Sequence, residues 1–296
     1  MVEKPGPILV TGANSGIGKA VTELLSEQGH IVYATARRPS ELDSLARLPG
    51  VTPLRLDVTR EVEVRQAVLD VQKQGHGLYG LVNNAGITDI APTVESSVED
   101  FARVMDVNLY GTHRMVQAFF PLLRESRGRI VNISSINGVA PFEFGAAYSA
   151  SKFALEAYSE VLRAELSEFG IRVCVIEPGG FRSAIVTNMF ARKPTASTTG
   201  VEASPFRDQC QKFLSDFAGT PEKMNRTIYP EPRPVAEAVA KALFAEKSRL
   251  HIMVGNKEET DWAIVHTLKL LNQLNQSSAQ PWPPEAILAR LGPAPG

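Results

Sequence analysis

The stretch Thr11-Gly12-Ala13-Asn14-Ser15-Gly16-Ile17-Gly18 stands between a short apolar run, Ile8–Thr11, and an amphipathic segment that begins at Gly18. This order predicts a strand, a tight turn and a helix. Glycines let a backbone turn sharply and approach phosphate groups, while the helix offers unpaired N–H groups and the positive end of its dipole. The glycine spacing departs from the plain GxGxxG form, so a turn that merely ends a strand stays open as an alternative. The context favours a pyrophosphate site.

Outward from this turn, short apolar runs rich in β-branched residues alternate with longer amphipathic stretches. This alternation is typical of an α/β fold in which crossover helices join parallel strands. Seven strands are expected, at Ile8–Thr11, Ile31–Ala36, Thr52–Leu56, Gly80–Asn83, Arg129–Ile133, Arg172–Glu177 and His251–Val254. Helices are expected at Gly18–Gln28, Ser40–Ala46, Glu61–Lys73, Val98–Glu125, Tyr148–Phe169, Pro234–Glu246 and Glu258–Asn275.

The stretch 181–234 interrupts this rhythm with threonines, prolines and a single amphipathic segment. It is too long for a plain connection, so we expect a mobile lid or substrate loop. We therefore predict one domain over residues 1–277, including the lid at 181–234, and a proline-rich tail over residues 278–296.

Charge and cysteine content narrow the choice of partners. The chain has 31 Lys and Arg against 32 Asp and Glu, with no long run of one sign, so nucleic acid and anionic membranes are not indicated and a small molecule is expected. Cys174 and Cys210 lie far apart, and neither they nor the five histidines show metal-ligand spacing. We expect no disulfide, no metal and a reducing, cytoplasmic location. The short charged segment before Ile8 leaves no room for a signal peptide, and no run is long enough to span a bilayer.

Tyr148 and Lys152 stand four residues apart in an expected helix, and Ser135 precedes the tyrosine by thirteen residues. Side chains at positions i and i+4 lie on one helix face, so the ammonium can sit beside the phenol and favour its phenolate form. Such a tyrosine can move protons near neutral pH. Taken alone, a Tyr-x-x-x-Lys pair is usually only a helix face, and a lone serine is usually a cap.

These residues occur together with Asn83-Asn84-Ala85-Gly86, Asn108 and Pro178-Gly179, in one order and at consistent spacing. In this set the chain resembles the short-chain dehydrogenases/reductases, closely from Ile8 to Ser183 and more loosely beyond. The resemblance implies a doubly wound Rossmann fold with helices on both faces of the sheet. It also implies binding of NAD or NADP at the carboxyl ends of the strands, and hydride transfer between nicotinamide and a carbonyl or alcohol.

The same resemblance implies catalytic roles for Asn108, Ser135, Tyr148 and Lys152. Tyr148 would protonate a carbonyl oxygen or deprotonate an alcohol, and Lys152 would lower the pKa of Tyr148 and hold the nicotinamide ribose. Ser135 would hydrogen-bond the same substrate oxygen. Asn108 would hold a water that links the lysine to solvent.

The resemblance further implies a set of cofactor contacts along the carboxyl edge of the sheet. Asp57 would receive the adenine amino group while Val58 packs on the ring, and Ser183 stands where relatives more often have threonine. The expected cofactor-binding residues are Gly12, Asn14, Ser15, Gly16, Ile17, Gly18, Arg37, Arg38, Asp57, Val58, Asn83, Ala85, Gly86, Tyr148, Lys152, Pro178, Gly179, Phe181 and Ser183.

The choice between NAD and NADP depends on the end of the second strand, where NAD enzymes place an acid on the ribose 2′-hydroxyl. That place falls on Ala36, and Arg37 and Arg38 follow with forked donors that suit a 2′-phosphate. We therefore predict a preference for NADP(H), with Asn14 and Ser15 as additional donors. The alternative is that both arginines face solvent.

The expected substrate pocket is largely apolar and aromatic, which predicts an apolar carbonyl substrate. The runs 33–37 and 148–156 also resemble the steroid and retinol branch of the family. Arg182 and Arg192 could equally receive an anionic group. The residues assigned to substrate are Asn137, Phe142, Phe144, Gly180 and Met189.

The function predicted from the sequence is that of an NADP(H)-dependent carbonyl reductase or alcohol dehydrogenase. The alternatives are a nucleotide-binding sensor or scaffold without turnover, and an epimerase or dehydratase that uses the same tyrosine. Relatives pair their two longest helices, so the resemblance implies a homo-oligomer, with a lid-shielded monomer as the alternative. The apolar residues expected on those helix faces are Leu109, Met115, Phe119, Leu155, Val161 and Leu162.

Overall fold

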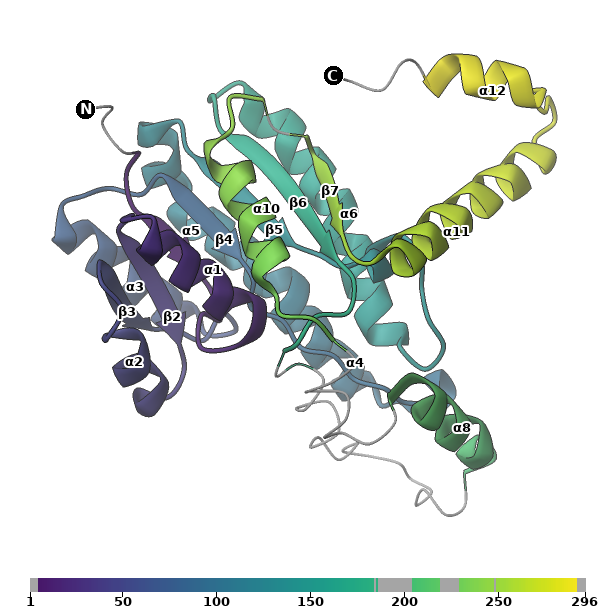
Figure 1. The fold of residues 1–296 in the computed structure, drawn as a ribbon, viewed down its shortest axis with the longest axis horizontal. Coiled ribbons are helices and arrows are strands. Elements are labelled where there is room, and N and C mark those ends of the chain that lie inside the picture. Colours follow the sequence, from purple (N-terminus) through teal and green to yellow (C-terminus); the bar gives the residue numbers. More distant parts are fainter. Residues whose placement is uncertain (1–4, 184, 186–203, 219–228, 248, 292–296) are drawn as a thin grey trace.

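The computed structural model describes residues 5–183, 185, 204–218, 229–247 and 249–291, and it forms a layered α/β structure around one sheet (Figure 1). All paired strands of the described chain run parallel, in the order β3-β2-β1-β4-β5-β6-β7. Their direction of progression reverses between β1 and β4, as in a doubly wound sheet. The strands are β1 (Ile8–Val10), β2 (Val32–Ala36), β3 (Val51–Arg55), β4 (Gly80–Asn83), β5 (Arg129–Ile133), β6 (Arg172–Pro178) and β7 (His251–Val254). The predicted seven-stranded parallel sheet is confirmed.

Each central strand supplies two separate hydrophobic cores. In β1, Ile8 and Val10 join one cluster of buried residues and Leu9 joins the other; in β2, Ala34 and Tyr33 divide in the same way. Successive side chains of a strand point to opposite faces, so a sheet covered on both sides needs continuous apolar runs. This requirement explains why these strands can be located from the sequence.

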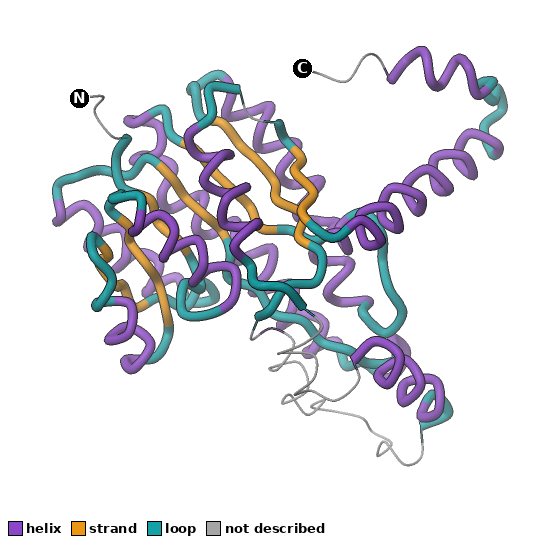
Figure 2. Tube along the Cα trace, in the orientation of Figure 1, coloured by secondary structure: helices purple, strands orange, loops and turns teal. Residues whose placement is uncertain are grey.

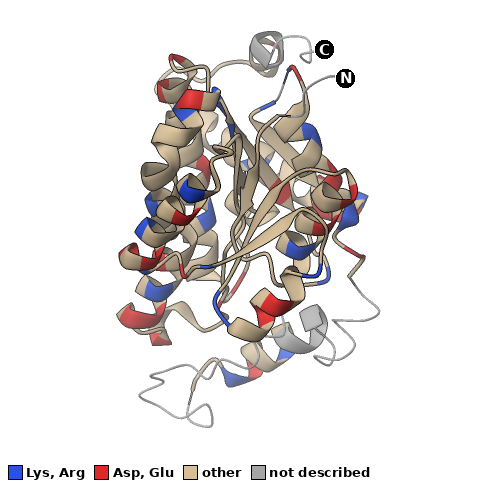
Figure 3. Ribbon diagram, turned by 90° about the vertical axis from the view of Figure 1, so that its left-hand side faces the viewer, with Lys and Arg blue, Asp and Glu red and all other residues tan. Residues whose placement is uncertain are grey.

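Helices cover both faces of the sheet, as Figures 1 and 2 show. One core contains side chains of α1 (Gly16–Glu27) and α10 (Arg233–Phe244), and the other contains those of α3 (Glu61–Gln74), α5 (Gly111–Ser126) and α6 (Ala146–Ser167). The shorter α2 (Pro39–Leu45) follows β2. Lys and Arg are interspersed with Asp and Glu over these helices (Figure 3), in line with the balanced charge of the chain.

The long helix predicted over Val98–Glu125 is instead three segments. It consists of α4 (Val98–Met105), a π-helical turn η2 (Asp106–Tyr110) and α5. A π turn inserts an extra residue into a helix and often occurs at functional sites. The apolar periodicity continues through the turn, so it does not reveal the interruption.

The apolar faces noted on the two longest helices are mostly buried. Met115, Phe119, Leu155 and Leu162 are buried, while Val161 is exposed. Burial of part of these faces is expected, because helices that cover a sheet pack an apolar stripe against it, and these four residues belong to the buried part. The oligomeric state stays a prediction.

Most of the predicted lid lies outside the described residues, as do Met189 and Arg192. The described part contains α8 (Arg207–Ala218), and Ser204 ahead of it donates a hydrogen bond to Glu95 at 2.7 Å. After β7, α11 (Lys257–Gln276) leads away from the sheet to α12 (Pro284–Leu291), which lies in the stretch predicted as a tail (Figure 1). No helix in the described ranges is both long and apolar enough to cross a bilayer.

Candidate active site

The glycine-rich turn connects β1 to α1 at the carboxyl edge of the sheet. Gly12 and Gly16 have φ angles of +64° and +53°, a region that favours glycine. The Ala13 N–H donates to the Thr35 carbonyl at 2.8 Å, which ties the turn to β2. Ser15 caps α1 without a side-chain hydrogen bond to the first turn. The first N–H groups of α1 thus have no side-chain cap, which suits the predicted anion site, and that site stays a prediction.

Gly18 does not line the cofactor cleft but packs beneath the turn. A Cβ atom at this position would collide with the Gly12 carbonyl oxygen and the Asn84 amide nitrogen. The Asn84 amide donates hydrogen bonds to the Thr11 carbonyl at 2.8 Å and the Gly12 carbonyl at 3.1 Å. Gly18 thus allows Asn84 to brace the turn.

Gly18→Ala is expected to lower the free energy of unfolding by about 1–3 kcal/mol, because the added methyl group must displace backbone in a packed region. Urea denaturation followed by circular dichroism would measure the loss. Gly6→Ala is the matched control, since its Cβ would only make an ordinary contact with Tyr79 at 3.5 Å. Equal stability of the two variants would contradict the close approach of Gly18 to the turn.

The Asn-rich segment after β4 corrects one assignment. Asn83, expected to contact the cofactor, still belongs to β4 and is buried, with its amide donating to Asn132 at 2.9 Å inside the sheet. Asn84 lines the cleft instead. The strand ends where it was predicted to end, but the side chain of its last residue, Asn83, bonds to Asn132 on the neighbouring strand, so the next residue is the one at the cleft. The Thr11 hydroxyl accepts the N–H groups of both Asn84 and Ala85 at 2.9 Å.

A single cleft of about 400 Å³ runs along the carboxyl edge of the sheet, from the end of β2 to Tyr148. It includes seventeen of the residues predicted to act: Gly12, Asn14, Ser15, Ile17, Arg37, Arg38, Asp57, Val58, Ala85, Gly86, Ser135, Tyr148, Lys152, Pro178, Gly179, Phe181 and Ser183. The cleft is also lined by residues for which the sequence analysis predicted no contact: Ala36, Leu56, Asn84, Ile87, Val107, Ile133, Ser134 and Ile185. Predicted residues outside its lining are Gly16, Gly18, Asn83, Asn108, Asn137, Phe142, Phe144 and Gly180.

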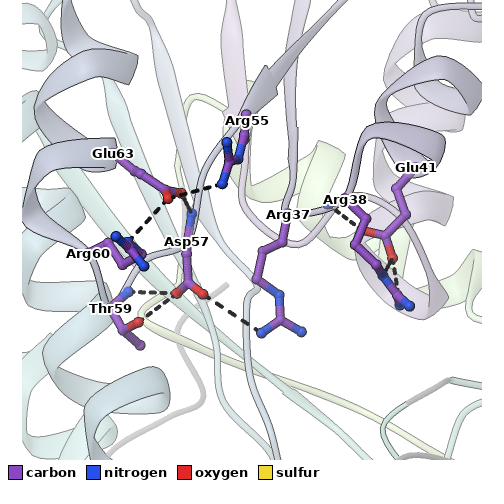
Figure 4. Close-up of polar contacts among 8 residues, drawn as sticks. All are labelled: Arg37, Arg38, Glu41, Arg55, Asp57, Thr59, Arg60 and Glu63. Atoms are coloured by element: carbon purple, nitrogen blue, oxygen red, sulfur yellow. Dashed lines mark hydrogen bonds and ion pairs between the residues drawn. The ribbon is translucent and has the colours of Figure 1, made fainter.

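At one end of the cleft, Asp57 is fixed by the segment that follows it (Figure 4). One carboxylate oxygen of Asp57 accepts hydrogen bonds from the Thr59 N–H at 3.0 Å and the Thr59 hydroxyl at 2.7 Å. The other oxygen lies 3.8 Å from Arg37, whose side chain is 63% exposed. The Asp57 N–H donates to Glu63 at 2.9 Å. Asp57 is therefore oriented, and Arg37 is held only loosely.

Arg38, beside it, is engaged by Glu41, a residue that the sequence analysis did not assign (Figure 4). Glu41 accepts hydrogen bonds from the Arg38 N–H at 3.1 Å and the Arg38 Nε at 2.9 Å. The Asn14 amide donates to the same carboxylate at 3.0 Å, so Glu41 links the glycine-rich turn to α2. Its position three residues after Arg38, at the start of a helix with Pro39, is the available sequence signal.

The structure brings Ser135, Tyr148 and Lys152 together at the other end of the cleft. Lys152 is buried, its Nζ donates to the Ile133 carbonyl at 2.8 Å and lies 5.6 Å from the centre of the Tyr148 ring. The Ser135 hydroxyl accepts the Asn137 N–H at 3.1 Å. A phenol, a hydroxyl and an ammonium thus share one site.

Burial dominates the electrostatics of this group. It raises the pKa of Tyr148, against which a hydrogen bond from Ser135 acts. It lowers the pKa of Lys152 to about 8, against which the negative charge of Glu156 acts. Burial disfavours both the phenolate form of Tyr148 and the ammonium form of Lys152. When Lys152 is charged, its positive charge stabilises the phenolate and so favours loss of the phenol proton.

Asn108 lies in the π turn, and its side chain anchors the surrounding backbone. Its amide oxygen accepts the Ile87 N–H at 2.8 Å, and its amide nitrogen donates to the Ile87 carbonyl and the Ser151 hydroxyl, both at 2.9 Å. A Cβ on Gly86 would lie 3.4 Å from Asn108 and 3.8 Å from Lys152, so glycine leaves space between these two residues. The water relay through Asn108 stays a prediction, with this space as the place for it.

Aromatic side chains gather beside Tyr148, outside the lining of the cleft. The ring centroid of Phe142 lies 6.3 Å from that of Tyr148 and 6.2 Å from that of Phe213 on α8, and Phe144 lies 5.3 Å from Phe213. Phe142 and Phe144 therefore lie beside Tyr148, and their role towards a substrate stays a prediction. Asn137 and Gly180, which were also assigned to substrate, bond to other protein groups. The Asn137 N–H donates to the Ser135 hydroxyl, and the Gly180 N–H donates to Glu259 at 2.8 Å.

The sequence and the fold of the chain are similar to those of known proteins. The NADPH-dependent 1-acyldihydroxyacetone phosphate reductase of Schizosaccharomyces pombe is 44% identical over 180 residues, which make up 60% of this chain and 60% of that protein. Human retinol dehydrogenase 5 is 33% identical over 263 residues, or 86% of this chain and 82% of that protein. A short chain dehydrogenase from Burkholderia cenocepacia, solved in complex with NADP, has a TM-score of 0.69 and 26% identity, covering 91% of this chain and 97% of its own.

The model of the short chain dehydrogenase family matches residues 7–194. That range contains the glycine-rich turn, the Asn84 segment and the group of Ser135, Tyr148 and Lys152, so the match covers the whole of the candidate site as far as Ser183. The chain belongs to the short-chain dehydrogenase family, in the branch that resembles the steroid and retinol dehydrogenases.

Proposed function

We propose that the chain is an NADP(H)-dependent oxidoreductase that acts on a carbonyl or alcohol of a small, mainly apolar substrate, with Tyr148 as general acid and base. The observation that carries this proposal is one cleft lined by Arg37 and Asp57, by the glycine-rich turn and by the group of Ser135, Tyr148 and Lys152. A nucleotide spanning the cleft would bring its reactive ring to the tyrosine.

The described residues fit such a dinucleotide. The uncapped amino end of α1 would hold the pyrophosphate, and Asp57 and Val58 would hold the adenine. Arg37 and Arg38 would hold a 2′-phosphate, since Ala36 offers no carboxylate to the ribose. The NADPH dependence named for the fission-yeast reductase and the NADP complex of the Burkholderia structure support the choice of NADP(H).

In reduction, the Tyr148 phenol would donate its proton to the carbonyl oxygen as the bound nicotinamide supplies a hydride to the carbonyl carbon. Ser135 would donate a hydrogen bond to the same oxygen and hold it at the phenol. Lys152 would stabilise the phenolate that remains and bind the ribose hydroxyls. The space at Gly86, between Asn108 and Lys152, is suited to a water that returns the proton.

The aromatic group of Phe142, Phe144 and Phe213 supports an apolar substrate. The names of two relatives point the same way, because retinol is largely hydrocarbon and acyldihydroxyacetone phosphate carries an acyl group. A substrate of this kind would place its reacting carbon at Tyr148 and its apolar part against these rings.

The test is consumption of NADPH with a panel of carbonyl compounds, followed by mass spectrometry of the product. The panel comprises steroid ketones, retinal, long-chain ketones and short polar ketones of matched reactivity. Faster turnover of the long apolar members is the expected result, with NADH a poorer donor. NADPH binding without oxidation by any member would favour a sensor or scaffold. Product formed without net NADPH consumption would indicate an epimerase or dehydratase.

A further inference from the structure

Three titratable residues, Glu156, Glu177 and His251, meet one helical turn beyond Lys152 and outside the cleft lining. One ligand atom of each lies within 4.8 Å of the others. Glu156 follows Lys152 by four residues on α6, so the two side chains share a helix face. Glu177 comes from β6, and His251 comes from the adjacent β7, opposite Val175.

His251 connects the buried acids to the surface. Its Nδ1 lies 2.8 Å from Glu177 and 3.2 Å from Glu156, both of which are buried. Its Nε2 lies 3.5 Å from Glu160, a residue on the next turn of α6 that is 63% exposed. The side chain of His251 is itself 38% exposed. The cluster therefore reaches from solvent to the residue beside the catalytic lysine.

The carboxylate of Glu156 lies in a confined and buried space. Within the described chain, neither of its oxygens accepts a hydrogen bond of good geometry. Gly138 makes room for it, because a Cβ there would lie 2.9 Å from Glu156 and 2.8 Å from the Ser134 hydroxyl. A buried carboxylate without donors is costly unless a cation compensates it, and the groups placed to do so are Lys152 and His251.

The pKa shifts of His251, Glu177 and Lys152 fit a cluster of buried acids between two cations. The contacts of the His251 ring with the carboxylates of Glu156 and then Glu177 raise the pKa of His251 to about 10 against the effect of burial, so a cation is expected there at neutral pH. Burial is the main cause that raises the pKa of Glu177. The negative charge of Glu156 in turn raises the pKa of Lys152 against burial.

We propose that Glu156, held by His251 and Glu177, is a positioning residue that keeps Lys152 in its charged form beside Tyr148. This role rests on the proposed function, because it acts through the proton chemistry of Tyr148. Glu156 does not touch the substrate or the cofactor cleft. It supplies the negative charge that the buried ammonium lacks.

The substitution that tests the proposal is Glu156→Gln, which keeps the shape of the side chain and removes its charge. Reduction requires the charged lysine, so kcat falls as the pH rises through the pKa of Lys152. Without Glu156 that pKa drops, and the fall in kcat is expected at a pH about one unit lower than in the wild type. Glu156→Asp, which restores the charge, is expected to move the profile back towards the wild type.

The matched control is Glu165→Gln, an exposed acid on the same helix. It lies thirteen residues beyond Lys152, or about 20 Å along the helix axis, so its pH profile is expected to equal that of the wild type. An equal loss of kcat at every pH in Glu156→Gln, with the fall unmoved, would show a merely structural role and overturn the proposal.

A second variant, His251→Gln, tests the ionic cluster without any turnover. The raised pKa of His251 makes its contribution to stability complete below its ordinary value of 6.5 and lost as the pH rises through about 10. His251→Gln should therefore destabilise the fold most below pH 6.5 and converge on the wild type above pH 10. A loss independent of pH would overturn the ionic cluster. Stabilisation of the wild type, but not of this variant, by added Zn²⁺ would reassign the residues to a metal site.

These two measurements separate the inference from the proposed function. A wild-type chain that turns over no substrate overturns the function and, with it, the role of Glu156 towards Tyr148, whereas the stability profile still reports on the cluster. A wild-type chain that is active while the Glu156→Gln profile stays unmoved overturns the role of Glu156 alone.

Discussion

Replacement of Tyr148 by phenylalanine is expected to lower kcat by about 10²- to 10⁴-fold, the range that a positioned general acid contributes. The variant keeps the ring that packs against Phe142 and loses only the hydroxyl that meets Ser135, which is the proposed proton donor to the substrate. Binding of NADPH should survive, because the turn at α1, Arg37 and Lys152 are untouched. Stopped-flow measurement of NADPH oxidation with the best substrate of the panel gives the chemical step directly.

Tyr110→Phe is the matched control, because it removes a tyrosine hydroxyl from a residue that is 52% exposed on the π turn and does not line the cleft. It is expected to match the wild type. Turnover by Tyr148→Phe within a few-fold of that control would mean that the proton comes from another group, and the mechanism would have to be abandoned. Loss of NADPH binding in Tyr148→Phe would instead show that the hydroxyl serves the cofactor.

The sheet and the proximity of Tyr148 and Lys152 could be predicted because their signals are local in the sequence. A strand covered on both faces, such as β1 or β2, must be apolar throughout, and all seven predicted strands end within one residue of their observed bounds. The proximity of Tyr148 and Lys152 follows from their spacing of four residues on a helix. The glycine-rich turn needs only a strand before it and a helix after it.

What could not be predicted depends on register or on distant parts of the chain. Asn83 ends β4 as predicted, yet Asn84 lines the cleft, and composition does not show which of two adjacent asparagines bonds inside the sheet. The π turn at Asn108 leaves the apolar periodicity intact. Glu177 and His251 stand 74 residues apart in sequence and meet only because β6 and β7 are neighbours.

The second large effect concerns the two arginines after β2. Arg37→Ser combined with Arg38→Ser is expected to raise the Kd for NADPH by about 10- to 100-fold, since a hydrogen bond to a charged group contributes about 1.5–3 kcal/mol. The Kd for NADH should hardly change, because NADH lacks the 2′-phosphate. Fluorescence titration with both nucleotides measures the ratio, which is insensitive to a general loss of folded protein.

The single variants should differ, because the two arginines are held differently. Arg38 already bonds to Glu41 through its Nε, whereas Arg37 has only a carboxylate at 3.8 Å, so Arg37→Ser should account for more of the loss. Arg55→Ser is the control, an exposed arginine on β3 that pairs with Glu63 and does not line the cleft. Affinities for NADPH and NADH that fall by the same factor would place both arginines on a part common to the two nucleotides. The preference for NADP(H) would then need another source, and the described cleft offers Asn14 and Ser15 as the next donors beside the ribose.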